Sequence, residues 1–166
     1  MTQIVTNSLP LGIAGDITRS GDGLAIEAQT MGTTPLTSYG LPAKLVSGAI
    51  TGIVGGDTAD LILGFLVRAN PSQGGNTSNE AFGAGTPPLA GVAVSLLKSG
   101  YIAVQNNFGT PAKEGIVYVR IAAPSGAKVV GGIEATADGA NTIIVPNAAF
   151  TGAADATGVA EVRFNV

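Results

Sequence analysis

The segment GVAVSLLKSGYIAV, residues 91–104, consists of two apolar runs separated by Lys98, Ser99 and Gly100. Glycine adopts the positive φ that hairpin turns require, so the pattern predicts two short strands joined by a turn at these three residues. Its apolar residues do not follow the three- and four-residue spacing of an amphipathic helix. The segment therefore indicates antiparallel β-structure.

Similar patterns recur on both sides of this segment. Alternation with a period of two, which is typical of strands, or short apolar runs bounded by turn residues predict further strands. They lie within residues 24–29, 44–54, 59–70, 116–121, 124–150 and 161–166, with turns at Gly55, Gly56 and Asp57 and at Asp138 and Gly139. We predict an all-β fold, a single-domain antiparallel β-sandwich or barrel without internal repeats.

Residues 1–23 are predicted to form an extended N-terminal arm in front of a β-domain at residues 24–166. In the part SLPLGIAGDITRSGDG, residues 8–23, apolar side chains are spaced mostly by two and are interrupted by proline and glycine, so a helix is not expected. A signal peptide is not expected either, because the first basic residue, Arg19, follows the apolar part. An extended arm cannot bury its own side chains, so we expect it to lie on the domain's own sheet edge or on a neighbouring subunit.

Two segments read as loops. Residues 70–88, NPSQGGNTSNEAFGAGTPP, are predicted to form a long exposed loop because they contain almost no residues that favour a regular element. Residues 150–158 form a second, shorter loop before the final strand. Long loops in compact domains are commonly functional.

The composition points to a protein that covers its surface with partners. The chain of 166 residues is 45% hydrophobic but only 11% charged, against about 25% in typical soluble domains. Its net charge of -3, with eight scattered basic residues, makes nucleic acid an unexpected partner. The most apolar run, residues 61–67, ends at Arg68 and is too short to span a membrane.

The chain contains no cysteine and no histidine. This excludes disulfides, zinc sites of the Cys/His type, thiol nucleophiles and catalysis that depends on histidine. The acidic pairs Asp57 with Asp60 and Asp16 with Asp22 could perform acid–base chemistry, but aspartates beside glycine and threonine are mostly turn formers. We therefore predict no catalytic, cofactor-binding or metal-binding residue, and no enzyme.

Seven pieces of the chain, in order and covering most of its length, carry a resemblance to a known family. They are GIAGDITR (12–19), YGLPAKLVSG (39–48), GFLVRANPSQ (64–73), SGYIAV (99–104), EGIVYVRI (114–121), GGIEATADG (131–139) and DATGVAEVRFNV (155–166). In these pieces the chain resembles the structural cement, or capsid decoration, proteins of tailed bacteriophages. The resemblance implies a jelly-roll-like β-protein of the virion that forms dimers or trimers and uses no cofactor. It also implies binding to the outer surface of the phage head, where such proteins clamp neighbouring subunits of the major capsid protein.

The arm supplies the candidate contacts with the capsid or with a neighbouring subunit. These candidates are Leu9, Leu11, Ile13, Asp16, Ile17 and Arg19. An alternative function is an extracellular β-sandwich module that binds carbohydrate or a host surface through residues 70–88. The absence of tryptophan argues against sugar binding, because aromatic platforms commonly hold sugars. A hydrolase that depends on carboxylates is a third alternative, supported only by the turn-like aspartates.

Overall fold

The computed structural model describes residues 11–21, 23–68, 87 and 89–166, and within them the predicted all-β fold is confirmed. The strands are β1 (Ala25–Thr30), β2 (Pro42–Val46), β3 (Ala49–Gly52), β4 (Gly64–Val67), β5 (Ala93–Phe108), β6 (Ile116–Arg120), β7 (Ile133–Glu134), β8 (Thr142–Phe150) and β9 (Val159–Phe164). Two 3-10 turns, η1 (Ala59–Leu61) and η2 (Gly139–Asn141), precede β4 and β8. The described residues include no helix that is long and apolar enough to cross a membrane.

The C-terminal strands close into a small barrel. β9 pairs with the second half of β5, β8 with β9, β6 with β8, and β7 with both β6 and β5. The pairing of β5 with β7 is parallel, and the other pairings in this ring are antiparallel. The ring returns to β5 and so leaves no open edge between its first and last strands.

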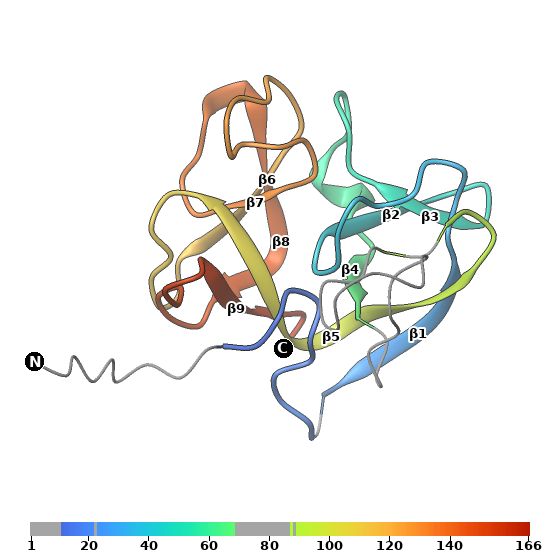
Figure 1. The fold of residues 1–166 in the computed structure, drawn as a ribbon, viewed down its shortest axis with the longest axis horizontal. Helices are drawn as coiled ribbons and strands as arrows, with labels where there is room; N and C mark the ends of the chain where they lie inside the picture. Colours follow the sequence, from blue (N-terminus) through green and yellow to red (C-terminus); the bar gives the residue numbers. More distant parts are fainter. Residues whose placement is uncertain (1–10, 22, 69–86, 88) are drawn as a thin grey trace, which may run out of the picture.

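The N-terminal strands are built on the first half of the same β5. β4 pairs with one edge of it, β2 with β4 and β3 with β2, while β1 pairs with the opposite edge. A parallel bridge between Met31 and Ile50 links the end of β1 to β3. Figure 1 shows the outcome: β5 passes from one group of strands to the other, with β6 to β9 on one side and β1 to β4 on the other.

Each group of strands encloses its own core. The cluster between β1 to β4 and the first half of β5 includes Met31, Leu41, Ile50 and Leu96, all nearly inaccessible to solvent. The larger cluster fills the C-terminal barrel. Phe65 of β4 joins this second core through an edge-to-face contact with Phe164 of β9, with ring centroids 5.2 Å apart. This contact ties the two groups together.

The structure corrects the hairpin prediction for residues 91–104. Lys98, Ser99 and Gly100 form no turn, because they lie inside the continuous strand β5. Gly100 has a φ of +137°, but it serves close packing: a Cβ there would lie 2.9 Å from Leu24 Cδ1. The two apolar runs therefore belong to one strand that serves both cores.

The neighbouring region also differs from the prediction. Residues 44–54 contain most of a hairpin, β2 and β3, which reverses at Ser47 and Gly48. β4 pairs with β2 and β5, so the turn at residues 55–57 does not join two paired strands. The loop predicted before β9, residues 150–158, is present between β8 and β9, with Phe150 as the last residue of β8.

The division into an arm at residues 1–23 and a domain at 24–166 stays a prediction. Residues 1–10 and 22, and the predicted loop at 70–88 apart from Pro87, lie outside the described residues. The strand order does not by itself identify a jelly roll, so that topology also stays a prediction.

Candidate functional site

The described part of the arm lies along β5. Gly15 N–H donates to the carbonyl of Ala103, and Ala103 N–H donates to the carbonyl of Asp16. Ile17 forms an antiparallel bridge with Ile102. The backbone of residues 15–17 therefore occupies the domain's own sheet edge, one of the two positions expected from the sequence.

Glu161 of β9 anchors the arm. Thr18 Oγ1 donates to Glu161 Oε1 at 2.6 Å, and Thr151 Oγ1 donates to Oε2 at 2.5 Å. Arg19 donates through Nε to Oε1 at 3.0 Å and through Nη2 to Oε2 at 2.5 Å. Four donors thus converge on one nearly buried carboxylate.

Two opposing effects act on the pKa of Glu161. Burial disfavours the charged carboxylate, but the hydrogen bonds from Arg19, Thr151 and Thr18 outweigh it and hold the pKa below its ordinary value. The hydrogen bonding between Arg19 and Glu161 in turn raises the pKa of Arg19. The pair is therefore ionised at neutral pH, and its attraction keeps the arm on β9.

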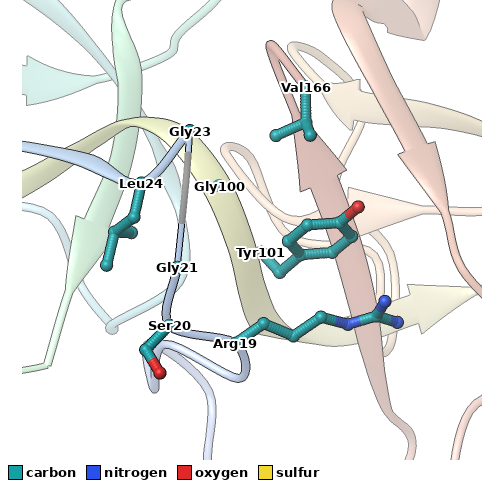
Figure 2. Close-up of a pocket in the computed structure, with 8 residues that line it drawn as sticks. All are labelled: Arg19, Ser20, Gly21, Gly23, Leu24, Gly100, Tyr101 and Val166. Atoms are coloured by element: carbon teal, nitrogen blue, oxygen red, sulfur yellow. The ribbon is translucent and has the colours of Figure 1, made fainter.

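Arg19 also borders a shallow pocket of about 40 Å³. Its guanidinium carbon lies 4.2 Å from the centre of the Tyr101 ring. In Figure 2, the side chains of Arg19 and Tyr101 lie to the right of the arm backbone that carries Gly21, and Leu24 lies to its left. Val166 lies above Tyr101. A pocket of this size holds no more than a few water molecules, so it is a junction between the arm and the barrel.

The six candidate contact residues occupy different environments. Leu9 lies outside the described residues. Ile13 is 44% exposed, whereas Ile17 packs against the C-terminal core. Leu11 is half-buried, and its N–H donates to Asp155 Oδ2 at 3.1 Å.

The other two candidates, Asp16 and Arg19, pair within the chain. Asp16 accepts the N–H of Ile13 and lies 3.8 Å from Arg68 Nε. With Arg19 bound to Glu161, both charged candidates hold the arm in place. Contacts of the six residues with another protein stay a prediction.

Asp155 orders the loop that receives the arm. Its Oδ1 accepts hydrogen bonds from Thr157 and from the N–H of Val159, and its Oδ2 accepts the N–H of Leu11. The hydrogen bond from the Thr157 hydroxyl is the largest of the effects that lower the pKa of Asp155. The residue is a turn former in the loop at 150–158 and connects that loop to the arm.

A second charged cluster was not predicted from the sequence. Arg120 of β6 and Glu134 of β7 are fully buried and form a bidentate pair, with Nε to Oε1 at 2.5 Å and Nη2 to Oε2 at 3.0 Å. Arg120 also donates to Asp138, which Lys128 contacts at 3.3 Å. The hydrogen bond from Arg120, followed by that from Lys128, lowers the pKa of Asp138. The sequence signal that could have indicated a buried pair is one charged residue in an otherwise apolar strand, Arg120 in β6 and Glu134 in β7.

The acidic pairs noted in the sequence show no catalytic arrangement in the described part of the chain. Asp57 accepts both Lys44 Nζ, at 2.6 Å, and the N–H of Val54, at 2.7 Å, which is the bonding of a turn aspartate. Asp60 lies in η1, and Asp22 is outside the described residues. No cluster of three or more potential metal ligands occurs among the residues described.

The surface also carries exposed apolar side chains. Those at least about two-fifths exposed are Ile13, Ile26, Leu45, Val46, Val54, Leu61, Leu89, Val92, Phe108, Ile116, Val129, Ile144 and Val166. An apolar cleft of about 130 Å³ also lies between the two groups of strands, where Pro35, Leu41 and Ile53 face Val130. Each of these side chains would gain from burial if another protein covered it.

Comparison with known proteins identifies the family. The model of the XM1 gp53 minor capsid protein family matches residues 1–164. Among solved structures, a chain from the capsid of Myoviridae phage XM1 has a similar fold, with a TM-score of 0.69, 18% sequence identity, and coverage of 99% of this chain and 97% of that chain. The search of curated proteins gave no match. The predicted relation to a phage capsid-associated family is confirmed, and the chain belongs to the XM1 gp53 minor capsid protein family.

Proposed function

We propose that this protein decorates the outer surface of a phage head and binds the major capsid protein. The match to a minor capsid protein family over residues 1–164 is the observation that carries this proposal, since it gives the chain a structural role in the phage capsid. Decoration would stabilise the head because opening of the shell would have to break additional interfaces.

The exposed apolar residues supply surface that a partner protein would bury. Burial of one large aliphatic side chain is worth about 1.5–3 kcal/mol, and a symmetric shell repeats each contact many times. On the arm, Ile13 and Leu11 offer apolar surface close to where the described chain begins. We assign the partner contact to these two residues and Leu9, and we assign the positioning of the arm to Asp16, Ile17 and Arg19.

We also propose that the protein associates with itself as a homodimer or homotrimer. The proposed role includes neither enzymatic activity nor binding to nucleic acid. A non-enzymatic role agrees with the structural family. In a decorated shell, each copy would then contact both the capsid and other copies, which spreads the clamp over several capsid subunits.

The test is reconstitution on heads that lack the protein. Purified wild-type protein is expected to bind these heads, to be visible on the outside by cryo-electron microscopy, and to raise the temperature at which the heads open. Ile13→Asp should weaken binding by about tenfold or more, since it places a charge in an apolar contact. The matched control is Leu45→Asp, on the β2–β3 hairpin, where Leu45 is 51% exposed. Location of the protein inside the head, or equal binding of Ile13→Asp and wild type, would contradict the proposal.

A further inference from the structure

Over most of its length, β1 has one edge without a partner among the described strands. It pairs with β5 along one edge, and β3 meets the opposite edge at the C-terminal end, where Met31 forms a parallel bridge with Ile50 and Gly32 N–H donates to the Ile50 carbonyl. The N–H of Met31 donates to Val92, and its carbonyl accepts from Gly91, so Met31 faces β5. Because backbone groups alternate along an antiparallel strand, those of Ile26 and Ala28 point to the open side, whereas Thr30 lies where β3 reaches this edge.

The open edge lacks most of the features that protect strand edges. Natural edge strands are commonly blocked by lysine, proline, inward charges or a covering loop. β1 has the sequence AIEAQT, and every residue in it except Gln29 is exposed. Its one charge, Glu27, lies 4.0 Å from Lys98 of β5. The edge is therefore accessible for pairing with another strand.

One segment of this chain has the composition of a matching strand. Residues 2–7, TQIVTN, are outside the described part of the structure, and they equal β1 in number. Thr2, Ile4, Val5 and Thr6 are β-branched, and the segment carries no charged side chain. Such residues favour strands. Pro10 follows shortly afterwards and, without a backbone N–H, favours the end of a paired segment.

We propose that residues 2–7 of one copy pair antiparallel with the open edge of β1 in a second copy. Among the described strands, every pair except β5 with β7 is antiparallel, apart from the isolated parallel bridge of Met31 with Ile50. The pairing deepens the self-association in the proposed function and depends on it for its role on the shell. It would join copies through backbone hydrogen bonds in addition to side-chain contacts.

The geometry favours a second copy over pairing within one molecule. Leu11 is fixed by Asp155 beside the end of β5 where Gln105 pairs with Val159. The nearest residue of β1 pairs with Ser99, six residues from Gln105, or about 20 Å along a straight strand. The proposed strand ends four residues before Leu11 and reaches about 14 Å from it. Figure 1 shows the same separation, with the first described residues beside β9 and β1 on the opposite side.

Engineered disulfides test the pairing in the full-length chain, which contains no natural cysteine. Glu27 occupies a position where facing strands bring side chains closest, because its backbone groups point to β5. The two test variants combine Glu27→Cys with either Ile4→Cys or Val5→Cys. Since alternate strand residues point to opposite faces, one of the two variants should form covalent dimers at least about tenfold more efficiently than the other.

The control replaces Glu27→Cys with Arg163→Cys. Arg163 lies on β9 and, like Glu27, forms an ion pair, here with Glu114. Both edges of β9 are occupied, by Tyr101 of β5 and Ala149 of β8. Neither N-terminal cysteine should cross-link to this position above background. Equal cross-linking of both N-terminal cysteines to Glu27→Cys, a link within one molecule, or no link either in solution or on heads would overturn the pairing.

A second variant leaves the described domain unchanged. Val5→Pro removes a backbone donor from the segment and should raise the dissociation constant for self-association by about tenfold or more, as measured by analytical ultracentrifugation. An unchanged constant would overturn the pairing. Cross-linking by a protein that fails to bind heads would contradict the proposed function alone, whereas head binding without cross-linking would contradict the strand pairing alone.

Discussion

Arg19 and Glu161 lie 142 residues apart in the chain and form a two-point ion pair, with Nε to Oε1 at 3.0 Å and Nη2 to Oε2 at 2.5 Å. Thr18 and Thr151 complete the shell of donors around the same carboxylate. The side chain of Arg19 is 54% exposed and that of Glu161 is 9% exposed. The arm is thus fastened at a point where one partner is fixed in the barrel and the other can be released to solvent.

Replacement of Glu161 should loosen the arm without unfolding the barrel. We expect Glu161→Gln to lower the free energy of unfolding by about 1–2 kcal/mol, less than for a fully buried pair, because Arg19 is solvent-exposed. Tryptic cleavage after Arg19 should become faster, which gel electrophoresis can follow. Glu114→Gln removes an exposed partner of Arg163 and is the control. Cleavage of Glu161→Gln at the wild-type rate would show that the ion pair does not hold the arm.

The buried pair of Arg120 and Glu134 should be far more sensitive. Arg120→Met leaves the carboxylate of Glu134 buried without its cation, which typically costs about 3–5 kcal/mol. The double variant with Glu134→Met removes both charges and should recover much of that loss. Urea unfolding measures all three proteins. If the double variant were less stable than Arg120→Met, the uncompensated charge would not explain the effect.

In the acid range, the free energy of unfolding should depend on pH through the carboxylates. The fold lowers the pKa values of Glu161, Asp138 and Asp155. These carboxylates therefore stabilise the folded state fully at a pH above their pKa values in the unfolded chain. This contribution is lost as the pH falls through their pKa values in the folded protein. Ordinary values are about 4.3 for glutamate and 3.9 for aspartate. The free energy of unfolding should therefore vary little between about pH 6 and 8 and fall below about pH 4.

Urea titrations across the pH range check this expectation. Glu161→Gln should show a shallower loss of stability on acidification than wild type, because one of the titrating groups is gone. The chain has no histidine, so a marked change in stability between about pH 6 and 7 would require a group outside this set.

Gly64 should tolerate no side chain. A Cβ at this residue of β4 would lie 2.2 Å from the carbonyl oxygen of Leu97 on β5, and backbone atoms of a paired strand cannot yield cheaply. Gly64→Ala is expected to destabilise the protein by several kcal/mol, on the order of 3, or to prevent soluble expression. Gly52→Ala on β3, whose Cβ would meet only Leu36 at 4.0 Å, is the control. Equal thermal stability of the two variants would contradict this role of Gly64.

Local pattern was sufficient for the β-class and for many of the strands. Alternation identified β1, β6 and β9 within a few residues, and the absence of histidine and cysteine restricted the chemistry through composition alone. Burial itself does not alternate in β1, which is mostly exposed, or in β9, which is mostly buried, so these predictions held because apolar and β-branched residues favour strands whichever strand lies beside them. The arm was also recognisable as extended, although its placement along β5 depended on Ala103 and Glu161, which lie far away in the chain.

Tertiary structure alone decided the course of residues 91–104. Lys98, Ser99 and Gly100 are compatible with a turn, but β1 and β4 pair with one half of the segment and β9 pairs with the other. These long-range hydrogen bonds favour a continuous strand over a hairpin. The same limit applies to Arg120 and Glu134: each is locally a charged residue in an apolar strand, and only the adjacent pairing of β6 and β7 provides the partner that makes burial possible.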